Sequence, residues 1–216
     1  AGIDLVGIDL EAFALLRALG TAGSETQDGG ALIGVSLGHE RSTFAVSDGR
    51  SCEFARVLGW GGAKLNAAIA RALAVTLTEA ETIKHGLSLV PVSADHQAVL
   101  AVPQGGRAPA FGEHTHADEQ SRKAVAAVRG ELHSFAHELV SSLQFYQSQP
   151  KALPISEIVL TGGTANLPGL DSELQRLVGV NVRVGYPLGR VTFAPATVPS
   201  DPDGALTVAV GLGIED

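Results

Sequence analysis

The spacing of hydrophobic residues changes along the chain from short continuous runs to steps of three or four. This change predicts where strands are followed by helices. Over residues 31–58 the apolar side chains come in three short runs, at 31–37, 42–47 and 51–58. Runs of this length, separated by polar turn residues, are typical of β-strands. Asp48 and Gly49 stand between the second and third runs, and this pair accepts the positive φ angles of a two-residue turn. We therefore expect these two strands to form an antiparallel hairpin.

After residue 60 the hydrophobic period lengthens to three or four. Gly61 and Gly62 lead into a segment with Leu65, Ile69 and Leu73 on one stripe, which predicts a helix. A second helix is expected over residues 78–85. Thr78 followed by Glu81 matches a capping box, and a glycine comes directly after the end.

A long amphipathic helix is predicted from about residue 118 to its stop at Pro150. Seven apolar side chains recur in it at steps of three or four: Val125, Val128, Leu132, Phe135, Leu139, Leu143 and Tyr146. Burying them contributes on the order of 10 kcal/mol before the entropy of the chain is subtracted. We expect this helix to be the main support of the domain.

The last third of the chain reads as strand, glycine turn, helix, strand and helix. The two strands are expected at 157–160 and 180–184, and the two helices at 167–178 and 205–211. Strands that alternate with helices on short connections indicate an α/β layer structure.

The two ends and the middle of the chain suggest the domain organisation. A strand at 3–8 and a helix at 10–19 read as the end of a preceding domain, and the small polar stretch 21–30 reads as a linker. Residues 31–216 are then a second domain, with a smaller subdomain at about 75–118. Prolines interrupt the pattern in that subdomain, where only 97–102 suggests a strand. The chain lacks methionine and opens inside an apparent strand, so we interpret it as a piece of a longer protein.

Composition narrows the class of protein. The hydrophobic share of 45% is enough for a core, and a net charge of -8 disfavours binding to nucleic acid or to an anionic membrane surface. The apolar runs are too short to cross a bilayer, so we expect a protein that is not embedded in a membrane. The single cysteine, Cys52, excludes a disulfide within the chain and is expected to be a small apolar core residue.

Three segments carry candidate chemistry, each with a purely structural alternative. Glycines in the turn 161–164, after a strand, would let a sugar or a planar ring approach the backbone, although tight turns need glycine for geometry alone. The hairpin 35–43 can aim N–H groups at phosphate oxygens or be an ordinary corner. Glu81 and Lys84 can bracket ribose hydroxyls or form a solvated ion pair.

Histidines provide the only pattern that could suggest a metal. His133 and His137 are four residues apart on the long predicted helix, and His114 and His116 flank Thr115. No third ligand follows a known spacing, so we expect solvated side chains and no metal site of this kind.

Taken in order, the motifs resemble a known family. The hairpin with Gly38, the glycines before the first helix, the Glu-Ala-Glu segment with Lys84 and the run LTGGTANLPGL are similar to the second domain of the actin-like ATPase superfamily. The segments GIDLEAFALLRAL, GGAKL and LQFYQSQ add a closer likeness to the PilM family of type IV pilus assembly proteins. The FtsA family is more distantly alike.

This resemblance implies a mixed sheet flanked by helices, as in the ribonuclease H-like domains, and a nucleotide site for ATP with Mg²⁺. The glycines of the turn would line the adenosine, the Glu81–Lys84 pair the ribose, and the hairpin the outer phosphates. The residues that it assigns to the site are Ser36, Gly38, Glu81, Lys84, Gly162, Gly163 and Thr164. No residue is assigned a catalytic role.

One position departs from the family pattern. Ser36 stands where an aspartate is usual, and a serine brings no negative charge to hold a magnesium-bound water. Weak or absent hydrolysis is therefore expected.

The resemblance also implies a setting for the protein. It would act in the cytoplasm, peripheral to the inner face of the membrane, on the cytoplasmic tail of a PilN-like protein of the pilus platform. Two alternatives stay open: a metabolite kinase of the same superfamily, and a scaffold that no longer binds nucleotide.

Overall fold

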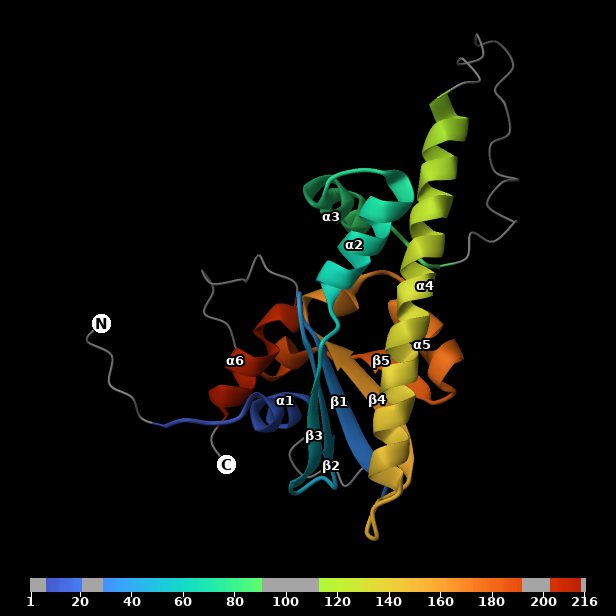
Figure 1. The fold of residues 1–216 in the computed structure, drawn as a ribbon. Coiled ribbons are helices and arrows are strands. Elements are labelled where there is room, and N and C mark those ends of the chain that lie inside the picture. The colour runs from blue at the N-terminus through green and yellow to red at the C-terminus, as the bar shows by residue number, and fades with distance from the viewer. Residues whose placement is uncertain (1–6, 21–28, 91–112, 192–202, 215–216) are drawn as a thin grey trace, which may run out of the picture.

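The computed structural model describes residues 7–20, 29–90, 113–191 and 203–214. Five strands form one mixed sheet: β1 (Ala31–Leu37), β2 (Ser42–Ser47), β3 (Cys52–Leu58), β4 (Ile155–Thr161) and β5 (Asn181–Val184). Their order is β3-β2-β1-β4-β5, with β1–β2 and β2–β3 antiparallel and β1–β4 and β4–β5 parallel. Helices flank this sheet (Figure 1). The predicted α/β class with a mixed sheet is confirmed.

The hairpin between β2 and β3 forms, but its turn is longer than predicted. Ser47 pairs with Cys52, so the loop contains four residues, and Gly49 has a φ of 90°. The Asp48 carboxylate accepts hydrogen bonds from the backbone N–H groups of Arg50 (2.8 Å) and Ser51 (2.7 Å). These bonds lower the pKa of Asp48 and replace the expected two-residue turn.

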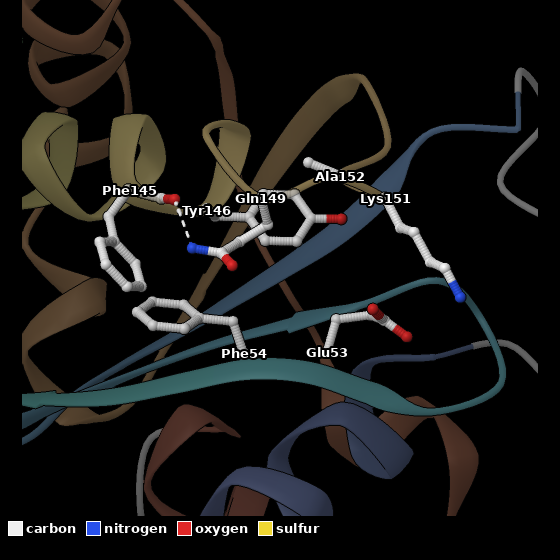
Figure 2. A pocket seen from close by; sticks show the side chains of 7 residues that line it. All are labelled: Glu53, Phe54, Phe145, Tyr146, Gln149, Lys151 and Ala152. Atoms are coloured by element: carbon white, nitrogen blue, oxygen red, sulfur yellow. Dashed lines mark hydrogen bonds between the residues drawn. The ribbon is translucent and has the colours of Figure 1, made fainter.

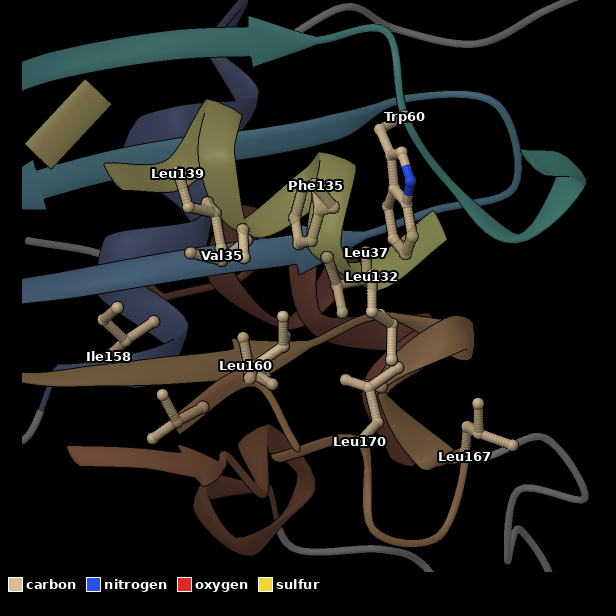
Figure 3. Packing of buried hydrophobic residues seen from close by; sticks show 14 of the residues in the cluster. Val35, Leu37, Trp60, Leu132, Phe135, Leu139, Ile158, Leu160, Leu167 and Leu170 are labelled. Carbon is tan, nitrogen blue, oxygen red and sulfur yellow. The ribbon is translucent and has the colours of Figure 1, made fainter. Parts of the chain in front are cut away.

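One face of the sheet carries the main core under α4 (Glu113–Gln147). Of the seven predicted stripe residues, six are buried and Val125 is half-buried. The Trp60 ring stacks on Phe135 of α4 with ring centroids 4.0 Å apart (Figure 3). Two further helices pack against α4, namely α2 (Gly62–Leu73) and α5 (Leu170–Val178). The long helix therefore holds this layer together.

The other face is covered by α1 (Glu11–Leu19), which packs against α6 (Thr207–Leu212). Gly34 of β1 gives α1 room to approach, because a Cβ there would lie 3.1 Å from Leu19 Cδ1. The helix α1, which the sequence pattern suggests is the end of a preceding domain, has its buried Leu15 and Leu16 on this sheet. Cys52 is half-buried and packs beside the same cluster, and burial raises the pKa of its thiol.

The helix α3 (Leu77–His85) begins one residue earlier than predicted, and its capping box differs from the predicted one. Thr76 is the N-cap, with the Glu79 N–H donating to its Oγ1 at 3.3 Å and its own N–H donating to Glu79 Oε2 at 2.8 Å. The hydrogen bonds that the Thr76 N–H and the Thr76 hydroxyl donate to the Glu79 carboxylate lower the pKa of Glu79. The predicted pair, Thr78 and Glu81, lies two residues on, inside the helix, and Glu81 is thereby free for another contact.

Three 3-10 turns complete the described elements: η2 (Gly163–Asn166), η3 (Pro187–Arg190) and η4 (Asp203–Leu206). The C-terminal helix, α6, starts two residues after its predicted position. Most of the predicted opening strand, all of the strand expected at 97–102 and most of the linker lie outside the described residues, and residues 7–10 form no strand.

Candidate functional site

The carboxyl ends of β1 and β4 lie next to each other in the centre of the sheet. Ser36 and Thr161 are partners in the parallel ladder, and each strand continues directly into a loop. In α/β sheets, ligands bind beside the carboxyl ends of such strands. The loop after β1 contains Gly38, and the loop after β4 contains the Thr161–Thr164 turn, so two of the predicted segments meet here.

Gly162 has a structural reason to be glycine. Its φ is 90°, and a Cβ on it would lie 2.7 Å from the backbone nitrogen of Leu37. Its N–H donates to the carbonyl of Gly204 at 3.2 Å. The purely geometric interpretation of the turn therefore accounts for Gly162. It does not account for Gly163, which is exposed and where a Cβ would meet nothing within 4 Å.

Thr164 ties the two loops together. Its Oγ1 donates a hydrogen bond to the carbonyl oxygen of Gly38 at 2.9 Å, and the Gly62 N–H donates to the same oxygen at 2.9 Å. The next N–H, of Ala63, donates to the carbonyl of His39 at 2.7 Å. The N-terminus of α2 is thus fixed on the loop after β1.

Lys84 reaches this junction from α3. A Cβ on Gly62 would lie 3.2 Å from Lys84 Nζ and 2.8 Å from Thr164 Oγ1, so only glycine leaves these two groups room. The Lys84 side chain is 11% exposed, and Glu81 Oε1 is its ion-pair partner at 3.8 Å. Burial lowers the pKa of Lys84, and the Glu81 carboxylate partly offsets that shift. A desolvated cation therefore stands beside two glycine loops.

Ser36 lies at the same end of the sheet but on a different face from Leu37. It alternates with Gly34 and so belongs to the α1 side, between Thr43 of β2 and Thr161 of β4 in the ladder. Thr43 Oγ1 donates to Glu11 Oε1 at 2.9 Å. The exposed Glu11 carboxylate is thereby held beside the strand that carries Ser36.

Sequence reasoning missed Glu11. The residue opens α1, which the pattern assigned to a preceding domain, and nothing in the spacing placed that helix against β2. Its only signal was an acidic residue at the first turn of a helix.

Of the seven predicted residues, the structure brings Gly38, Lys84 and Thr164 together around Gly62. Glu81 joins them through its ion pair, and Gly162 and Gly163 belong to the turn that Thr164 closes. Ser36 is two residues before Gly38. The set combines exposed glycine backbone, which suits a flat base, with one cation that suits a hydroxyl-rich or anionic group.

No preformed metal cage exists in the part of the chain that the structure describes, where no group of three or more His, Cys, Asp or Glu side chains comes together. His133 and His137 are exposed on α4, whereas the side chains of His114 and His116 lie outside the described residues. Among the described helices, none has the length and apolar character needed to cross a membrane.

Comparison with known families gives one match along most of the chain. The sequence model of the family described as "Cell division protein FtsA" matches residues 33–211. A protein of that name from Rhizobium meliloti (strain 1021) is 30% identical over 184 residues, which are 83% of this chain and 39% of the relative. The one from Escherichia coli (strain K12) is 30% identical over 159 residues, 71% of this chain and 37% of the relative. The chain thus spans about two fifths of these relatives.

Solved structures agree on the fold. The "PilM-PilN type IV pilus biogenesis complex" matches with a TM-score of 0.67 at 24% identity, over 96% of this chain and 52% of that one. MreB5 of Spiroplasma citri bound to ADP matches with a TM-score of 0.61 at 16% identity, over 98% and 60%. At these identities the likeness is one of fold, and the predicted assignment to PilM itself is not confirmed.

Proposed function

Because the chain belongs to the FtsA family, and its solved neighbours are actin-like ATPases, we propose that it binds ATP where β1 and β4 end. The observation that carries this proposal is the meeting of Gly38, Lys84 and Thr164 around Gly62. These groups come from three segments far apart in the sequence. An ordinary turn needs no cation from a third segment, whereas a nucleotide has three chemically different parts to contact.

Each segment has a role in this proposal. The exposed backbone at Gly163 faces the adenine, since no side chain there would block a flat ring. Glu81 and Lys84 hold the ribose hydroxyls, the carboxylate accepting and the ammonium donating. The Ser36 hydroxyl, at the end of β1, and the backbone of the loop that follows Gly38 present O–H and N–H donors to the outer phosphates. Thr164 positions that loop through its hydrogen bond.

Magnesium would accompany the phosphates, and it neutralises their charge when bound. In this chain Ser36 has an O–H that can donate to a phosphate, and it supplies no negative charge. The Glu11 carboxylate, which Thr43 orients, is held beside the strand that carries Ser36. We infer that hydrolysis is weak or absent, and that the state of the nucleotide serves mainly to set the shape of the domain.

Calorimetry on the full-length protein with ATP and Mg²⁺ tests the binding proposal. Heat of binding, together with a rise in melting temperature, is the expected result. If neither is observed, the alternative that the protein is a scaffold that does not bind nucleotide is the better interpretation. Transfer of the terminal phosphoryl group of ATP to a sugar or a carboxylate acceptor would instead support the other alternative, a metabolite kinase.

For the biological role, we propose assembly of a membrane-associated machine from the cytoplasmic side. The PilM–PilN neighbour supports a type IV pilus platform and a PilN-like tail as the partner. The relatives from Rhizobium meliloti and Escherichia coli, which are named cell division protein FtsA, support a role in cell division instead. Deletion of the gene separates the two: loss of pili at normal cell length supports the pilus role, and filamentous cells that keep their pili support division.

A further inference from the structure

The end of the sheet opposite the nucleotide loops carries a groove that the proposed function does not use. It has a volume of about 240 Å³ and lies between the start of β3, the end of α4 and the connection to β4 (Figure 2). Phe54 and Phe145 form one end of it, and Glu53 and Lys151 stand at the other. We call it the aromatic groove.

The aromatic end of this groove is incompletely covered. The Phe54 ring lies 5.4 Å from that of Phe145 and 5.9 Å from that of Phe44, measured between centroids. Phe44 is fully buried, but Phe145 is 55% exposed. A large apolar side chain would gain by covering these rings, since burial of aromatic surface is favourable.

The groove lies along an edge of the sheet. β3 is the last strand in the order, so nothing pairs with its outer side among the described residues. Half of the N–H and C=O groups of such a strand point away from the sheet and can pair with an extended chain. Val57, on the opposite face from Phe54, is 60% exposed. An added strand would place alternate side chains against Phe145 on one face and Val57 on the other.

Charge indicates the chemistry of such a strand. Arg56 donates to Ser142 Oγ at 3.3 Å, and neither it nor Lys151 has an acidic partner among the described residues. Glu53 is the one carboxylate that lines the groove. In a chain of net charge -8, two cations without acid partners beside an apolar groove favour an acidic ligand.

We propose that the β3 edge and the aromatic groove bind an extended, acidic segment of a partner protein. The segment pairs with β3 as an added strand, inserts one large apolar side chain beside Phe54 and Phe145, and places an acidic side chain toward Lys151. Because this site is at the other end of the sheet, it is independent of the nucleotide proposal.

Selection from a phage-displayed library of random dodecapeptides on the full-length protein, with counter-selection on Phe145→Ser, tests the proposal. We expect the selected peptides to alternate apolar residues with Asp or Glu. When synthesised, the selected peptides should bind at least about tenfold more weakly to the Phe145→Ser and Lys151→Glu variants than to the wild type, as measured by fluorescence anisotropy. Tyr186→Ser removes an aromatic ring that is 70% exposed elsewhere, and it should leave the affinity unchanged.

Hydrogen exchange with the bound peptide tests the strand addition itself. Amides of β3 should gain protection that the Phe145→Ser variant does not show. Three results overturn the proposal. They are the absence of any selected peptide whose binding depends on Phe145, the selection of peptides rich in Lys or Arg, and peptide binding without protection of the β3 amides. Self-association of the protein that Phe145→Ser abolishes, with no peptide binding, would assign this surface to a second copy instead.

Discussion

Thr164 Oγ1 donates to the carbonyl oxygen of Gly38 at 2.9 Å, a hydrogen bond between residues 126 positions apart. This bond joins the turn after β4 to the loop after β1. Because the same carbonyl also accepts the Gly62 N–H, it links three segments in one place. The geometry of the proposed nucleotide site depends on this junction.

Thr164→Val removes that hydrogen bond and keeps the shape of the side chain. The Gly38 oxygen retains the bond from Gly62, so we expect a loss of only about 1 kcal/mol in the free energy of unfolding. ATP affinity should fall further, because the loop that meets the phosphates loses its anchor. Urea unfolding and calorimetry measure the two effects. Thr82→Val, at an exposed hydroxyl that donates within α3, is the control. Equal ATP affinity in both variants would contradict the assigned role.

The two adjacent glycines of the turn should respond differently to substitution. Gly163→Val adds a side chain where there is open space, so the fold should stay native while ATP affinity falls at least about tenfold. Gly162→Val places a β-branched residue at a φ of 90° against the Leu37 backbone, and it should destabilise the fold by more than about 3 kcal/mol. Circular dichroism and calorimetry separate these outcomes. If Gly163→Val binds ATP with the affinity of the wild type, the adenine does not bind at this turn.

Lys84→Met replaces the buried ammonium with an apolar chain of similar length. ATP affinity should fall, whereas stability at neutral pH should hold or rise, because desolvation of the cation opposes folding. The pKa of Lys84 is lowered in the folded protein, so this penalty is complete below that pKa and declines as pH rises toward the ordinary 10.5.

The free energy of unfolding of the wild type, relative to Lys84→Met, should therefore increase with pH in that alkaline window. Urea titrations at several pH values measure the difference. Lys64→Met, at an exposed lysine on α2, should show no such trend. A difference that stays constant with pH would mean that Lys84 is well solvated.

Hydrolysis can be tested at the two residues next to the phosphate loop. Ser36→Asp in the full-length protein should raise ATP turnover about tenfold, which corresponds to about 1.4 kcal/mol off the barrier. Glu11→Gln should lower whatever turnover the Ser36→Asp protein shows, since Thr43 holds the Glu11 carboxylate beside the strand that carries Ser36. Phosphate release is the measurement. If Ser36→Asp leaves turnover flat, the missing charge is not what limits the reaction.

Most of the fold could be predicted from local patterns. The strands β1 to β3 and the stripe of α4 follow directly from hydrophobic periodicity, because each buries one face against one layer. The capping box on Thr76 was misplaced by two residues, since Thr78 and Glu81 have the same spacing as Thr76 and Glu79. Local spacing alone does not distinguish them, and the hydrogen bonds do.

The site was less accessible to sequence reasoning. The joint order of motifs led to Gly38, Lys84 and Thr164, but only tertiary packing places them around Gly62. Glu11 and the aromatic groove were missed for the same reason. Glu11 meets Thr43, and Phe145 meets Phe54, across contacts that no periodicity encodes.

The ladder that joins Ala31 to Ile155 also has a kinetic consequence. During synthesis the hairpin strands emerge before α4 and β4, and their apolar face stays uncovered until both have been made. The partner strand β4 begins more than a hundred positions after the start of β1. Closing such a large loop is slow and costs entropy. We expect the nascent chain to depend on chaperones until β4 docks, and refolding in the test tube to compete with aggregation.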